Sequence, residues 1–222
     1  MFPISDVIPS RTVPFVTIGL IAVNALVFLY ELLLPSRLLE LFIQHYALIP
    51  VWFRWPTLLT SMFLHAGFWH VVPNMLYLWI FGDNVEDRIG HAPYLAFYIA
   101  AGLVAAIAQL AINPLSTVPM LGASGAIAGV MGAYFVLYPQ SRVLTAVFVL
   151  IFFDVVEIPA IFFLGLWFLL QLLSGVGSIG VSSVAGGGTA FFAHIGGFVA
   201  GVIVGVAVRS RDRRWQHYEP RY

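Results

Sequence analysis

The interval from Ile89 to Ser141 reads IGHAPYLAFYIAAGLVAAIAQLAINPLSTVPMLGASGAIAGVMGAYFVLYPQS and contains no Asp, Glu, Lys or Arg. A helix needs about 20 mostly apolar residues to cross a bilayer. The interval has 53 residues, so it predicts two membrane-spanning helices. Asn113-Pro114 and Pro119 provide the break between them, because both are typical of turns and loops.

Other charge-free intervals extend this pattern along the chain. Thr12 to Tyr30 and Trp55 to Gly82 each predict one span, and Ile158 to Val208 predicts two spans divided by the Gly and Ser rich segment Ser174 to Gly188. Val143 to Phe153 is too short to cross, so we expect an interfacial connector or the start of the fifth helix there. The sequence therefore predicts an all-α polytopic membrane protein, a bundle of six transmembrane helices.

The composition agrees with a membrane protein. Hydrophobic residues make up 61% of the chain and charged residues 9%, whereas a soluble domain has roughly a quarter charged residues. The net charge is zero, so the basic footprint that nucleic acid requires is missing. The chain has no Cys and therefore no disulfide, thiol nucleophile or cysteine-ligated metal.

Arginine distribution predicts the orientation. An even number of spans places both termini on one side, and the C-terminal tail is rich in arginine: Arg209, Arg211, Arg213, Arg214 and Arg221. The positive-inside rule makes that side cytoplasmic, with eight of the ten Arg inside. We expect a multi-pass protein of the cell membrane in contact with the lipid bilayer. Its parts are a cytoplasmic N-terminus (1–11), a membrane domain (12–208) and a basic cytoplasmic tail (209–222).

The segment Pro35 to Pro56 is external in this topology. It contains Trp52, Phe53, Arg54 and Trp55, a mixture that suits a structure at the level of the lipid headgroups. An ordinary external loop is the alternative.

Two polar residues lie near the external surface of predicted spans. The fourth helix should begin near Gly122 and the sixth near Ala190, so Ser124 and His194 both lie about one turn below that surface. Each alone would usually be explained by a hydrogen bond to its own or a neighbouring helix. A polar group at bilayer depth nevertheless often marks a functional site.

Small residues predict that the fourth and sixth helices pack closely. Glycines spaced along these helices allow backbones to approach in a membrane: Gly125, Gly129 and Gly132 on the fourth, and Gly197, Gly201 and Gly205 on the sixth. His194 shares the glycine face of its helix, because it lies three residues before Gly197. Ser124 and His194 should therefore meet.

An imidazole beside a hydroxyl can take its proton during nucleophilic attack and later return it to a leaving amine. Asp154 and Glu157 belong near the opposite side in this topology, so no third carboxylate is expected. The prediction is a Ser124 and His194 dyad.

Candidate oxyanion donors lie at the same depth. The Ser124 backbone N–H is one, because helix N-termini carry free N–H groups. His70 and Asn74 share one face of the second helix, and His65 precedes them by five residues. The alternative is that these three only cap and join helices. No metal is expected, because the chain has no His-Glu-x-x-His motif, and no cofactor is required.

Three motifs together resemble a known family. They are His65-x4-His70-x3-Asn74, Gly122-Ala123-Ser124-Gly125, and Ala193-His194-Ile195-Gly196-Gly197. Over roughly Leu58 to Val208 the chain resembles the bacterial rhomboid intramembrane serine proteases.

The resemblance implies a six-helix fold with a dyad that opens outward. Ser124 would be the nucleophile and His194 the general base, and His70 and Asn74 would help the Ser124 N–H bind the oxyanion. The implied substrates are membrane proteins, cut in or near transmembrane helices that unwind easily. Some members of the family place a Tyr one turn after the serine, where this chain has Ala128, so the group that orients His194 is left open.

Two functions outside proteolysis remain as alternatives. The first is a catalytically silent rhomboid-like protein that binds or escorts membrane helices. The second is a small transporter, for which broken helices and intramembrane charge would be expected. The substrates, the element that gates their entry, regulation and the oligomeric state are not evident from the sequence.

Overall fold

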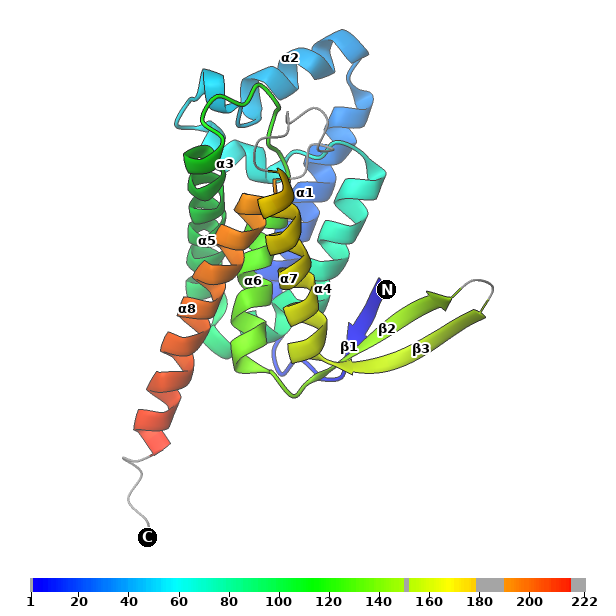
Figure 1. Ribbon diagram of the computed structural model, residues 1–222, viewed down its shortest axis with the longest axis vertical. Helices are drawn as coiled ribbons and strands as arrows, with labels where there is room; N and C mark the ends of the chain where they lie inside the picture. Colours follow the sequence, from blue (N-terminus) through cyan, green and yellow to red (C-terminus); the bar gives the residue numbers. More distant parts are fainter. Residues whose placement is uncertain (1, 150–151, 179–189, 217–222) are drawn as a thin grey trace.

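Long apolar helices dominate the computed structural model, which describes residues 2–149, 152–178 and 190–216 (Figure 1). The long helices are α1 (Phe15–Leu33), α4 (Phe68–Ile89), α5 (His91–Ile112), α6 (Ser124–Leu137), α7 (Ala160–Ser178) and α8 (Phe191–Gln216). Four of them, α1, α5, α7 and α8, are long and apolar enough to cross a membrane, and α6 is apolar but shorter. The predicted class, a helical polytopic membrane protein, is confirmed.

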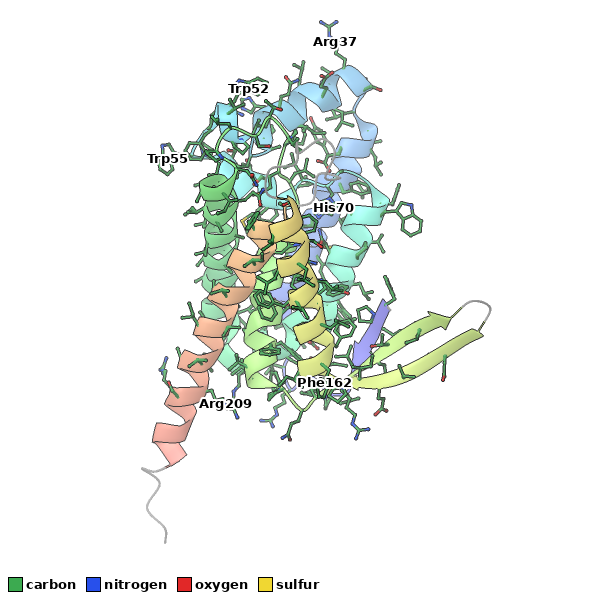
Figure 2. All side chains as sticks on the ribbon, in the orientation of Figure 1. Arg37, Trp52, Trp55, His70, Phe162 and Arg209 are labelled. Atoms are coloured by element: carbon green, nitrogen blue, oxygen red, sulfur yellow. The ribbon has the colours of Figure 1, made fainter. Side chains whose placement is uncertain are left out.

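The predicted break between the third and fourth spans is present, since α5 ends at Ile112 and α6 begins at Ser124. Shorter elements follow α1: α2 (Ser36–Tyr46), η1 (Pro50–Trp52), α3 (Thr57–Thr60) and η2 (Ser61–Phe63). Figure 1 shows α2 lying across the upper end of the bundle. In Figure 2, Trp52 and Trp55 lie at the periphery of this end, and Trp55 is 77% exposed. The headgroup-level position expected for Pro35 to Pro56 stays a prediction.

A small antiparallel sheet is the main departure from the all-α prediction. Strands β2 (Arg142–Val149) and β3 (Phe152–Pro159) form a hairpin in which Arg142 pairs with Pro159, and β1 (Phe2–Asp6) pairs with β2. The predicted helix start at Val143 to Phe153 is wrong; the segment is a connector made of strands. Its Val, Thr, Ile and Phe residues favour strands, and β1 comes from the distant N-terminus, which no local pattern reveals.

Helix α6 lies at the centre of the bundle, packed against α4, α5 and α8. Its interface with α8 brings two backbones into contact. A Cβ on Gly201 would overlap the Gly129 carbonyl oxygen, and a Cβ on Gly132 would overlap the Phe198 carbonyl oxygen. Only glycine permits this approach.

Carboxylates of α4 cap the start of α1 at the lower end of the bundle. Glu86 accepts the N–H groups of Val16 and Thr17 at 2.9 and 2.8 Å, and Asp87 accepts those of Arg11 and Thr12 at 2.8 and 3.0 Å. Val16 and Thr17 lie in the first turn of α1, where N–H groups have no intrahelical partner, and Arg11 and Thr12 lie in the segment just before it. The caps therefore tie α1 to α4.

Two predicted segments fall partly outside the described residues. The predicted linker Ser174 to Gly188 begins within α7, which extends to Ser178, and residues 179–189 are not described. The predicted tail begins within α8, which continues to Gln216, and residues 217–222 are not described.

Candidate active site

Ser124 is the first residue of α6, and the loop before it is held in place by backbone hydrogen bonds. Leu48 and Met120 exchange N–H to carbonyl bonds of 3.0 and 2.8 Å, and the Gly122 N–H donates to the Ser61 carbonyl at 2.8 Å. Gly122 has φ +117°, and a Cβ there would lie 2.7 Å from the His70 ring. Position 122 therefore requires glycine both for its conformation and for space.

The structure brings Ser124 and His194 together at the upper end of the bundle. Ser124 Oγ lies 2.8 Å from His194 Nε2, a hydrogen-bond distance. His194 is in the first turn of α8, and both side chains are partly buried. Below them Gly197 packs against Gly125, where a Cβ would overlap the Gly125 carbonyl oxygen. The contact between the two backbones sets the distance between the two side chains.

Helix α7 contacts the other side of the imidazole. Gln171 Oε1 lies 2.8 Å from His194 Nδ1, and the ring of Trp167 lies 5.8 Å from the imidazole centroid at an angle of 36°. Sequence reasoning missed Gln171. A signal was available, because Gln171 is an amide inside the charge-free interval Ile158 to Val208, where a polar side chain needs a partner.

His70 and Asn74 converge on Gly122, two residues before Ser124. From the position of a Cβ on Gly122, His70 Nε2 would lie at 2.7 Å and Asn74 Nδ2 at 3.7 Å. Figure 2 shows His70 within the upper part of the bundle. Donors on these two side chains therefore lie on the loop side of the α6 N-terminus.

His65 contacts both His70 and Asn74. Its Nε2 is 3.1 Å from Asn74 Nδ2, and its ring is 5.1 Å from that of His70. The Glu31 carboxylate accepts the His65 N–H at 3.2 Å. Sequence reasoning also missed Glu31, a carboxylate in the last turns of α1 that is only 3% exposed. His65 thus contacts Asn74 rather than Ser124, and Glu31 holds its backbone.

A cavity of about 20 Å³ adjoins Ser124, enough to hold one water molecule. Ser61, Gly102, Met120 and Ala193 are among the residues that line it. Hydrolysis at Ser124 inside a membrane requires space for a water molecule, which this cavity offers.

Helix α6 has 14 residues and rises about 21 Å, so it is shorter than the roughly 30 Å core of a bilayer.

Within residues 2–149, 152–178 and 190–216, no three His, Cys, Asp or Glu side chains are arranged to hold a metal ion. The described site consists of a hydroxyl, an imidazole, an amide acceptor and candidate donors beside a helix N-terminus. This set is suited to acyl transfer.

The fold and site define a multi-pass helical membrane protein with a serine and a histidine in hydrogen-bond contact. A family model described as the rhomboid domain matches residues 52–211, which is more than half of the chain. The chain belongs to the rhomboid family.

Several relatives share parts of the sequence. Rhomboid protein 1, mitochondrial, of Saccharomyces cerevisiae is 29% identical over 169 residues, which cover 72% of this chain and 45% of the relative. Rhomboid protease GluP of Bacillus subtilis is 42% identical over 36% of this chain and 15% of its own length. The human presenilin-associated rhomboid-like protein, mitochondrial, is 32% identical over 38% of this chain and 23% of its own. The chain therefore matches less than half of each relative's length. Membership of this family supports intramembrane protease activity in general.

Proposed function

We propose that this protein is an intramembrane serine endopeptidase in which Ser124 is the nucleophile and His194 the general base. The observation that carries the proposal is the 2.8 Å contact between Ser124 Oγ and His194 Nε2. Family membership supports the same class of activity. No cofactor takes part.

The reaction follows from this contact. Ser124 Oγ attacks the scissile carbonyl carbon while its proton passes to His194 Nε2. The bond to the leaving nitrogen then breaks, and His194 returns the proton to the departing amine. Water attacks the acyl-enzyme by the same sequence, with His194 as base, and releases Ser124.

Three donors would stabilise the oxyanion formed in each step. They are the Ser124 N–H, which has no intrahelical partner at the start of α6, and the side chains of His70 and Asn74. The convergence of His70 and Asn74 on Gly122 supports this assignment.

The substrates in this proposal are membrane proteins whose transmembrane helices unwind easily, because the peptide must become extended to reach Ser124. Both termini of the protease are cytoplasmic in the cell membrane, and the site opens to the external face. The excess of arginine in the C-terminal tail supports this orientation.

A fluorophosphonate, which reacts with activated serines, tests the proposal. The wild-type protein in detergent micelles should be labelled, and Ser124→Ala and His194→Ala should not. Ser116→Ala is the matched control, since Ser116 accepts the Val118 N–H in the loop before α6. Wild-type protein that is folded but neither labelled nor able to cleave reporter membrane proteins would favour the binding alternative.

A further inference from the structure

Gln171 is a polar residue on a helix face that is otherwise used for packing. Trp167, Gln171 and Gly175 are four residues apart and so share one face of α7. Trp167 contacts the rings of His194 and Phe198, while a Cβ on Gly175 would lie 3.4 Å from Phe191. This face of α7 therefore lies against α8, with Gln171 opposite His194.

The side of α7 that does not pack against α8 is exposed. Leu166, Leu170 and Leu173 are 48%, 51% and 63% exposed, as expected for side chains that meet lipid. Only the stripe with Gln171 reaches the site, so a substitution at Gln171 can be compared with one at Leu170 on the same helix.

The hydrogen bonds of His194 determine which end of the Gln171 amide must face it. A neutral imidazole has one N–H and one acceptor nitrogen. If Ser124 Oγ–H donates to Nε2, the proton of the ring is on Nδ1, and that N–H requires an acceptor. The Gln171 carbonyl oxygen, 2.8 Å from Nδ1, is such an acceptor.

We propose that Gln171 is the positioning residue that holds His194 in the tautomer and orientation needed to accept the Ser124 proton. The inference rests on the proposed function. Gln171 does not touch the reacting atoms; it acts through the imidazole, as an amide does in Cys-His-Asn proteases.

A neutral amide suits this depth in the membrane. A carboxylate would add a charge that is costly to bury in a bilayer, while an amide oxygen can accept the Nδ1–H without one. Among the described residues, His70 on α4 is the other titratable group that interacts electrostatically with His194. The amide therefore orients the base without itself titrating.

The test compares Gln171→Met, Gln171→Glu and the control Leu170→Met in cleavage of a reporter membrane protein. Met keeps the length of the side chain but cannot accept the Nδ1–H as an amide oxygen does. We expect Gln171→Met to lower kcat about 10- to 100-fold, the effect of removing a hydrogen bond to a group that becomes charged. KM and the unfolding temperature should stay close to those of Leu170→Met.

Gln171→Glu supplies the readout that a purely structural role would not change. Its carboxyl oxygen can still accept the Nδ1–H, so kcat should recover relative to Gln171→Met. An ionised carboxylate would also stabilise the imidazolium, so the acid limb of the pH and rate profile should move to higher pH.

A Gln171→Met protein with the kcat and pH profile of the Leu170→Met control would overturn the assignment of Gln171 while Ser124-dependent labelling leaves the protease proposal intact. If Gln171→Met fails to fold, an unchanged pH profile in folded Gln171→Glu overturns it instead. A folded wild type that is neither labelled nor able to cleave reporter membrane proteins would overturn the proposed function, and the inference with it.

Discussion

The two ends of α6 each place a hydroxyl beside an acid-base group. At the upper end Ser124 Oγ lies 2.8 Å from His194 Nε2. Ten residues later, about 15 Å along the helix, the Tyr134 hydroxyl donates to Asp6 at 2.5 Å. Tyr134 also lies 2.8 Å from Ser141 Oγ.

The surroundings of the two hydroxyls differ. Ser124 begins its helix, is partly exposed and adjoins a cavity. Tyr134 is completely buried, and Asp6 also accepts a hydrogen bond from Asn84 at 3.1 Å. A buried polar pair is thus not sufficient for chemistry. Free N–H groups at the start of α6 and a cavity with space for a water molecule distinguish the upper end, whereas the lower pair fastens β1 to the bundle.

The largest expected effect separates these roles. Ser124→Ala should abolish cleavage of a reporter membrane protein and leave the unfolding temperature in detergent unchanged, because only the nucleophile is removed. Cleavage assays and thermal unfolding of the same preparation measure both. Cleavage by Ser124→Ala at the wild-type rate would contradict the proposed role of Ser124 as the nucleophile.

Asn74→Ala should lower kcat by about 100-fold, the usual effect of losing one oxyanion donor. Asn84→Ala is the matched control at the lower end, since Asn84 binds Asp6 and not the candidate site. We expect Asn84→Ala to lower stability without changing the rate per folded molecule. Equal kcat values for the two variants would remove Asn74 from the oxyanion site.

Tyr134→Phe should lower the free energy of unfolding by about 1 to 3 kcal/mol, because Asp6 loses a donor in a buried setting. The rate of cleavage per folded molecule should not change. Tyr30→Phe is the control, since Tyr30 is 51% exposed on α1. Denaturant titration in mixed micelles measures the difference, and a loss of activity without loss of stability would contradict the assigned role.

The smallest expected effect is the pH dependence of stability that Asp6 produces at the lower end of α6. Burial, with a further contribution from the charge of Asp83, raises the pKa of Asp6 to about 6. A carboxyl whose pKa is raised on folding favours the folded state at low pH and loses that contribution as pH rises through about 6. The unfolding temperature of the wild type relative to Asp6→Asn should therefore rise as pH falls from about 7.5 to about 5. A difference that is independent of pH would show that Asp6 does not titrate in this range.

Local patterns were sufficient for most of the helices. Apolar intervals without charge predicted the long spans, since a bilayer excludes charge along its whole thickness. The hairpin from Arg142 to Pro159 was not predicted, because an apolar segment of that length is compatible with either a helix or strands. The third strand of the sheet, β1, pairs with β2, which lies more than a hundred residues later in the sequence.

The sequence by itself determined the helical membrane class, the glycine faces of α6 and α8, and the set of polar residues that includes Ser124 and His194. Only the tertiary structure decided which groups contact that pair. Gln171 reaches His194 from α7, and Glu31 reaches the backbone of His65 from α1, both through the packing of whole helices. Periodicity within one helix does not specify which neighbour its polar residue will meet. The orientation of His194, open in the sequence, is therefore a property of the assembled bundle.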